Sequence, residues 1–183
     1  WEVAGSSHVD VPFEIEYAKV RNLMAGLPLG NVQPRETDCA LPAYSTVPFR
    51  DVMNAAFEHL VKWIGDETPP PIAPRLQVAQ ALPSVEFARD RFGNILGGIR
   101  LAEHAVPTAK NTGMNSGTGN RFCFLYGSHE AFSEAQLRNL YSSREEYVQA
   151  VTSVVQENLS DGYILPYAAE RTIRNAQTRD IGR

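Results

Sequence analysis

The clearest hydrophobic pattern in the chain is a helical one over Pro48–Ile64. Apolar side chains recur there at the spacing of one helix face, with a histidine among them (Val52, Ala55, Ala56, His59, Leu60 and Trp63). Pro48 suits a first helical position, and Gly65 followed by the prolines of 69–71 suits a stop. The pattern predicts an amphipathic helix that packs on a core, with His59 as a packed, hydrogen-bonded residue.

The last third of the chain predicts a helical tail. Two serines stand three residues before a Gln or Glu, at 133–136 and 143–146, which is the spacing of a capping box. They predict helices over 133–141 and 143–160, and Pro166 opens a final helix to about Ala176.

The middle of the chain shows extended patterns. Leu76–Val78 is strand-like, and two short runs, Val85–Arg89 and Ile95–Arg100, flank a turn that contains Asp, Gly and Asn. These turn residues favour a β-hairpin. Asn111–Asn120 is rich in Gly, Asn, Ser and Thr, which predicts a loop.

The N-terminal part is less regular. Trp1–Gly5 is a mostly apolar run ended by glycine, which predicts a strand that enters a Gly-Ser-Ser loop. Residues 9–47 form a long excursion rich in Pro, Gly and polar residues, with a helical turn expected around Glu16–Met24. We expect the carboxylates of Glu14 and Glu16 to be solvated.

Composition narrows the class of protein. The chain has 183 residues, of which 43 % are hydrophobic and 21 % charged, and this fits a single soluble domain. No apolar run of about 18 residues exists, so no membrane span is expected. The net charge is −4 and Lys and Arg are not clustered, which argues against a nucleic-acid partner.

The residues offer no metal or cofactor motif. Cys39 and Cys123 form no C-x-x-C and have no nearby histidine pair, so no structural zinc is expected. The glycine-rich stretch Gly113–Gly119 lacks the Lys-Ser or Lys-Thr of a phosphate-binding loop. The two cysteines form either two buried thiols or one disulfide, and the residues alone favour thiols.

Of the histidines, His8 has the setting that suits catalysis. It follows the strand-like N-terminal run by two serines, and loops at strand ends are where α/β enzymes place reactive groups. Residues alone still favour an ordinary loop histidine here. His104 and His129 lie in polar surroundings and are expected to be exposed. The G-x-S-x-G nucleophile elbow is absent from the chain.

Several segments, the helix from Pro48 to Ile64 among them, together resemble α/β-hydrolase domain proteins. Trp1–Asp10 resembles their last core strand and histidine loop, and Arg89–Arg100 resembles their hairpin. Cys123–Ser128 and Gly162–Pro166 also match, so the resemblance extends over nearly the whole chain. It implies an α/β fold: the C-terminal portion of an α/β-hydrolase fold, with a terminal core strand, an amphipathic helix, a β-hairpin and a helical tail.

In domain terms, the resemblance implies that residues 1–183 are the C-terminal part of one α/β-hydrolase domain. Residues 1–74 hold the core strand, the histidine loop and the C-terminal helix, and residues 75–183 hold the hairpin and the tail. We expect the hairpin and the tail to pack on the helix from Pro48, because neither can bury its apolar face alone.

The resemblance also implies a chemistry. In this fold the serine comes first, then the acid, then the histidine. The chain would therefore supply His8 as general base, while the serine and the acid lie upstream of Trp1 in the same or a separate chain. The implied substrates are small and ester-like. Asp10 is interpreted as structural rather than as the acid, and the competing hypothesis is a non-catalytic scaffold or binding module.

The same resemblance bears on the cysteines. Cys39 and Cys123 both fall in segments that flank the hydrolase core, which makes a disulfide as expected as two thiols. Such a bond would indicate a secreted or periplasmic parent protein.

Overall fold

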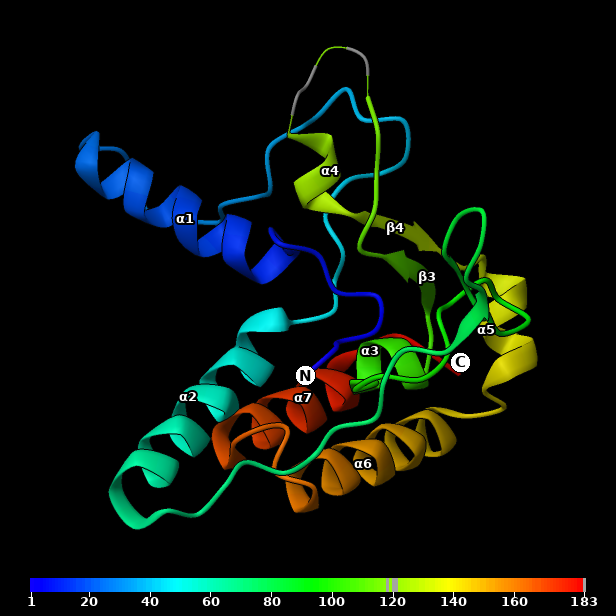
Figure 1. Ribbon diagram of the computed structural model, residues 1–183. Coiled ribbons are helices and arrows are strands. Elements are labelled where there is room, and N and C mark those ends of the chain that lie inside the picture. The colour runs from blue at the N-terminus through cyan, green and yellow to red at the C-terminus, as the bar shows by residue number, and fades with distance from the viewer. Residues whose placement is uncertain (118, 120–121, 183) are drawn as a thin grey trace.

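The computed structural model describes residues 1–117, 119 and 122–182, and most of them lie in helices and loops (Figure 1). The strands form two small antiparallel sheets within this part of the chain, β1 with β2 and β3 with β4. The elements in chain order are α1 (Val11–Met24), α2 (Phe49–Asp66), β1 (Val78–Gln80), β2 (Glu86–Phe87), α3 (Ala102–Ala105), β3 (Ala109–Thr112), α4 (Cys123–Tyr126), β4 (Ser128–Ala131), α5 (Glu134–Leu140), α6 (Arg144–Ser160) and α7 (Pro166–Thr178).

The predicted helical tail is confirmed, and it builds most of the core. Helices α2, α7 and α6 lie side by side, with α7 in the middle (Figure 1). The buried side of α7 carries alanines, which let it approach α6 closely. On the other side, Asn54 Nδ2 donates to Tyr167 Oη at 2.5 Å, which joins α2 to α7. The tail therefore meets α2 near its start, but Leu60 and Trp63 on the predicted apolar face of α2 are 44 % and 52 % exposed, so the expected packing of that face was only partly right.

Local capping chemistry fixes where the tail helices begin. Ser133 Oγ accepts from the N–H of Gln136, and Gln136 Oε1 accepts from the N–H of Ser133, which is a complete capping box. Ser143 caps α6 in the same way. The carboxylate of Glu146 instead accepts from the N–H of Ser142 at 2.8 Å, so the second box is only half formed.

The start of α2 depends on a residue far away in the chain. The helix begins at Phe49, one residue after Pro48, and the N–H of Phe49 donates to Asp10 Oδ2 at 2.9 Å. The other oxygen, Asp10 Oδ1, accepts from the N–H of Phe13 at 2.7 Å and caps α1. The structural role expected for Asp10 is therefore confirmed, because one carboxylate caps two helices.

The N-terminal helix is longer than the helical turn expected at Glu16–Met24. Helix α1 starts at Val11, directly after its aspartate cap, and has 14 residues. Glu14 is only 1 % exposed, so its expected solvation was wrong. Arg35, from the following loop, folds back so that its Nε lies 2.7 Å from Glu14 Oε1. Glu16 is exposed and pairs with Lys19.

The hairpin predicted around residues 90–94 is confirmed as a tight antiparallel turn. Arg89 and Ile95 form an antiparallel bridge. Within the turn, Asp90 Oδ1 accepts from the N–H groups of Phe92 and Asn94, at 2.8 and 3.0 Å. The tip packs on β3 rather than on α2, because Asn94 Oδ1 accepts from the N–H of Asn111. The expected packing of the hairpin on α2 was therefore wrong.

The predicted N-terminal strand is reduced to a single parallel bridge between Val3 and Ile99 among the described residues. The N–H of Ala4 donates to Ile99 O, and the N–H of Ile99 donates to Glu2 O. Gly5 then adopts φ +72°, a left-handed conformation that turns the chain out of the bridge. The expected terminal core strand is therefore present only as an extended segment.

The loop predicted over Asn111–Asn120 is wrong at its start, because its first residues belong to strand β3. Residues Asn111 and Thr112 pair with β4, with Thr112 opposite Ser128. Residues 118 and 120 of that prediction lie outside the described residues.

Cys39 and Cys123 form a disulfide bond, with their Cα atoms 5.6 Å apart. The preference for two thiols that the residues alone gave was therefore wrong, and the disulfide that the resemblance made equally expected is the outcome found. The bond joins the loop between α1 and α2 to helix α4. No helix in the described part of the chain combines the length and apolar character needed to cross a membrane.

Candidate functional site

His8 projects from a loop whose backbone is held on both sides. The residue is exposed, and its side chain makes no hydrogen bond with the residues that the structure describes. Before it, Ser7 Oγ donates to Val9 O at 3.0 Å, and after it the N–H of Val9 donates to Leu125 O at 2.9 Å. The loop therefore fixes where the imidazole stands and leaves its ring nitrogens open.

Asp10 does not serve as the acid partner of His8 in this geometry. Both of its carboxylate oxygens accept backbone N–H groups, from Phe13 and Phe49. Burial raises the pKa of Asp10, and the two N–H donors oppose that shift. The carboxylate is 2 % exposed, so it has a structural function rather than a catalytic one.

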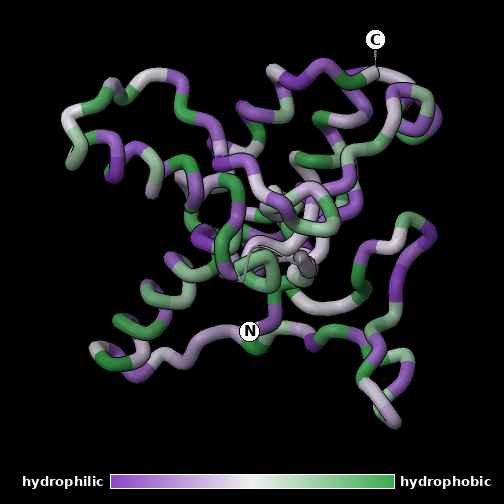
Figure 2. The backbone as a smooth tube through the Cα atoms, turned by 90° about the horizontal axis from the view of Figure 1, so that it is seen from above, coloured by the Kyte–Doolittle hydropathy of each residue, from purple (hydrophilic) through white to green (hydrophobic). Residues whose placement is uncertain are grey.

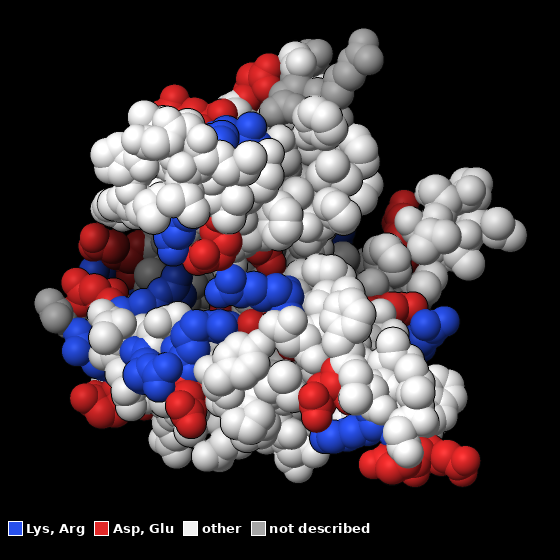
Figure 3. Space-filling model, turned by 90° about the vertical axis from the view of Figure 1, so that its left-hand side faces the viewer, with Lys and Arg blue, Asp and Glu red and all other residues white. Residues whose placement is uncertain are grey.

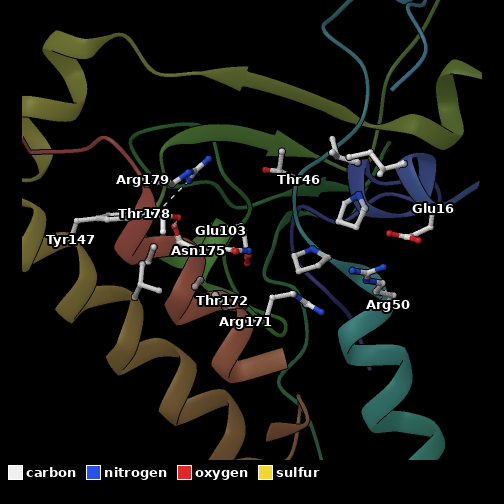
Figure 4. Close-up of a pocket in the computed structure, with 17 residues that line it drawn as sticks. Glu16, Thr46, Arg50, Glu103, Tyr147, Arg171, Thr172, Asn175, Thr178 and Arg179 are labelled. Carbon is white, nitrogen blue, oxygen red and sulfur yellow. Dashed lines mark hydrogen bonds between the residues drawn. The ribbon is translucent and has the colours of Figure 1, made fainter. Parts of the chain in front are cut away.

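A pocket of about 520 Å³ with several charged residues in its walls lies between α1, α2, α3 and α7 (Figure 4). Figure 3 shows basic side chains gathered along a hollow on one face of the molecule. His8 does not line the pocket, although Val11, three residues further along the chain, does. The charged residues of the lining are Glu16, Arg50, Glu103, Arg171 and Arg179.

The three arginines of the pocket have different partners. Arg171 forms an ion pair with the buried carboxylate of Asp51. The Nε atom of Arg50 lies 4.0 Å from the same carboxylate. Arg179 donates to two hydroxyls, Thr108 Oγ1 at 3.0 Å and Tyr147 Oη at 3.4 Å. The pocket therefore presents guanidinium groups that are only partly neutralised.

Glu103 brings a titratable carboxyl into this pocket from α3 (Figure 4). Burial raises its pKa from 4.5 to about 7, and the negative charge of Asp51 on α2 acts in the same direction. The positive charges of Arg179, directly after α7, and of Arg171 on α7 oppose this shift. The carboxyl therefore changes its protonation state near neutral pH.

We expect Glu103 to make the stability of the protein depend on pH. The folded state keeps a proton on Glu103 between pH 4.5 and about 7, where the unfolded chain has released it. Stability therefore falls as the pH rises through this window. Glu103→Gln should remove most of this fall, so thermal melting of both proteins at about pH 5 and about pH 8 checks the prediction. An equally steep fall in the variant would contradict it.

His104 is buried, and its expected exposure was wrong. Its side chain is fully buried, with Nε2 2.8 Å from Ile95 O. Burial lowers the pKa of His104, which favours the neutral ring. The imidazole packs against Gly5, where a Cβ atom would collide with it. The residue fills a gap between the N-terminal segment and the hairpin, which its sequence surroundings did not indicate.

His129 is partly buried, so its expected exposure was also wrong. Its Nδ1 lies 3.0 Å from Asn111 Oδ1 and 3.2 Å from Thr46 Oγ1. Burial lowers the pKa of His129 as well. His59 is packed and hydrogen-bonded as predicted, with Nε2 2.9 Å from Gly162 O.

The pocket residues were missed because they come from distant segments of the chain. One signal was available: Arg171 and Asn175 stand four residues apart, and therefore on one face of α7. Nothing in the local sequence links them to Glu103 or Arg50.

As for metals, the described residues contain no group of three or more His, Cys, Asp or Glu side chains arranged to hold an ion.

Comparison with known proteins identifies the family. The model of the family described as "Alpha/beta hydrolase domain" matches residues 1–174, which is nearly the whole chain. The comparisons with curated proteins and with solved structures gave no match. The chain therefore belongs to the alpha/beta hydrolase domain family.

Proposed function

We propose that this chain supplies the catalytic histidine, His8, of a serine hydrolase that acts on small ester-like substrates. The serine nucleophile and the acid would lie in the N-terminal remainder of the hydrolase domain, in the same or a separate chain. Family membership supports the reaction class, since hydrolases of this fold place the histidine last in the chain order of the triad.

The observation that carries the proposal is the contrast between His8 and the other histidines. The rings of His59, His104 and His129 are each engaged within the fold, two with backbone carbonyls and one with polar side chains. The ring of His8 is exposed on a loop that its neighbours hold in place. A base must reach the proton it takes, so an open ring on a fixed loop suits that role.

The proposed chemistry is acyl transfer. The serine oxygen attacks the ester carbonyl while His8 takes the serine proton. His8 then gives this proton to the oxygen of the leaving alcohol, and the tetrahedral intermediate collapses to the acyl-enzyme. Water then attacks the acyl-enzyme, and the same histidine takes a proton from the water and returns it to the serine. The acid would hold the imidazole in the required tautomer.

Exposed apolar side chains support the proposed N-terminal partner. Hydrophobic residues lie on projecting segments of the chain as well as in its centre (Figure 2). Large apolar side chains exposed in number on one element are a mark of an interface. The large exposed apolar residues on α1 and α2 include Phe13, Tyr17, Val20, Leu23, Phe57, Leu60, Val61 and Trp63.

The disulfide bond supports a secreted or periplasmic location for the same protein.

Covalent labelling of the full-length protein tests the proposal. An organic fluorophosphonate reacts with activated serines, whose oxygen bonds to phosphorus and displaces fluoride. We expect peptide mapping to place the label on the serine of a G-x-S-x-G sequence N-terminal to Trp1. A label on a serine within the 183 residues would refute this assignment of the nucleophile. A folded protein that takes no label would favour the non-catalytic scaffold instead.

A further inference from the structure

We propose that the pocket between α1, α2, α3 and α7 binds the oxyanion group of a small organic molecule, a carboxylate or a phosphate. The inference goes beyond the proposed hydrolase function, because it does not require His8 to be catalytic. It stands on the charges, donors and size of the pocket, and nothing in the proposed triad depends on it.

The first argument is that positive charge exceeds negative charge in this pocket. Three arginines and two glutamates line it. Arg171 forms a close ion pair with Asp51, and Arg50 Nε lies 4.0 Å from the same carboxylate. Asp51 is 2 % exposed, so it lies behind the pocket rather than inside it. Arg179 hydrogen-bonds to hydroxyls, which carry no charge. An oxyanion would complete the pairing of these guanidinium groups.

The two carboxyl groups of the lining do not cancel this excess. Glu16 pairs mainly with Lys19, whose Nζ lies 2.9 Å from Glu16 Oε1, and interacts more weakly with Arg50. Glu103 has a pKa of about 7 because of its burial, so at neutral pH a large fraction of it carries no charge. In its protonated form Glu103 is a hydrogen-bond donor, which can contribute to binding an anion.

The second argument concerns the size and walls of the pocket. A volume of about 520 Å³ lies in the range of pockets for small molecules. Thr46 and Asn175 add neutral hydrogen-bonding groups, and Val11, Ile15 and Val151 add apolar surface. The combination fits a small molecule with at least one anionic group and a short aliphatic part.

Calorimetric titration of the purified protein with three probes tests the proposal. Succinate represents a carboxylate, inorganic phosphate represents a phosphate, and succinamide is the neutral counterpart of succinate. We expect saturable binding of succinate, phosphate or both, and no binding of succinamide. Binding of succinate alone assigns a carboxylate ligand, and binding of phosphate alone assigns a phosphate ligand. If neither anion binds, or if succinamide binds as tightly as succinate, the proposal is wrong.

Three single variants place the binding in this pocket. Arg50→Gln on α2 and Arg179→Gln at the end of α7 should each weaken anion binding by about 10-fold or more, as expected for loss of a charged hydrogen bond. Arg174→Gln is the matched control, because Arg174 lies on α7 outside the pocket and is 65 % exposed. We leave Arg171 unchanged, since its loss would strand the buried charge of Asp51.

The comparison among the variants decides the outcome. Thermal melting confirms that each variant is folded, and the two pocket arginines belong to separate elements, so one misfolded variant leaves the other as a test. Wild-type affinity in Arg50→Gln and Arg179→Gln would overturn the assignment. An equal loss in Arg174→Gln would overturn it too, because the effect would then reflect overall charge rather than this pocket.

Discussion

Removing the Cys39–Cys123 disulfide bond is expected to lower the free energy of unfolding by about 4 kcal/mol. The bond joins residues 84 positions apart, so it withdraws much conformational freedom from the unfolded chain. Alanine replaces both cysteines in the double variant Cys39→Ala/Cys123→Ala. Cys123 is only 1 % exposed, so a polar replacement there would bury a new polar group and lower stability for a separate reason. Urea unfolding of the variant and the wild type gives the difference directly.

The same change is expected to loosen the loop that carries His8. Helix α4 contains Cys123, and its Leu125 O accepts from the N–H of Val9. The adjacent Tyr126 O accepts from the N–H of Ser45. Amide hydrogen exchange should therefore speed up at Val9 and Ser45 when the bond is absent.

A reducing agent provides the control for the disulfide prediction. It should lower the stability of the wild type toward that of the double variant and leave the double variant unchanged. Two alkylatable thiols in the oxidised wild type, or a double variant as stable as the wild type, would show that the bond does not have this role.

Elements whose signals are local could be predicted from the sequence. The serines at 133 and 143 and Pro166 mark the starts of α5, α6 and α7, because a cap acts within three residues of its own position. The turn of the hairpin follows for the same reason, since Asp90 bonds to N–H groups two and four residues away.

Features that depend on distant partners could not be read from the sequence. Glu14 is buried because Arg35 reaches it across 21 positions, and α2 is capped by a residue 39 positions before it. His104 is buried because the N-terminal segment and the hairpin close around it. Local polarity gave the opposite expectation in both buried cases.

The candidate functional residues likewise include one that the sequence indicated and a group that it did not. His8 stood out because a strand-like run and two small residues precede it, and the resemblance to α/β-hydrolases gave it a role. The pocket was not predictable, because Arg50, Glu103 and Arg171 lie in separate segments that only the folded chain brings together.

Replacing His8 by alanine is expected to reduce ester hydrolysis by the full-length protein by about three powers of ten or more. Without a base the serine stays protonated and is a weak nucleophile at neutral pH. The remaining rate would come from binding and from stabilisation of the oxyanion. The melting temperature should change little, because His8 is exposed and makes no side-chain hydrogen bond within the described residues.

His59→Ala is the matched control, because it removes a histidine that the fold uses for packing. The ring of His59 lies 2.9 Å from Gly162 O through Nε2 and 5.6 Å, centroid to centroid, from the ring of Trp1. Its loss should lower the melting temperature and leave the turnover of each folded molecule near that of the wild type.

The most direct test is kcat/KM for a short-chain chromogenic ester, measured with full-length wild type and His8→Ala at equal concentrations of folded protein. A loss of about a thousandfold or more, with an unchanged melting temperature, is the result that a catalytic His8 predicts. A value of kcat/KM near that of the wild type would contradict it and would leave His8 as an ordinary loop residue.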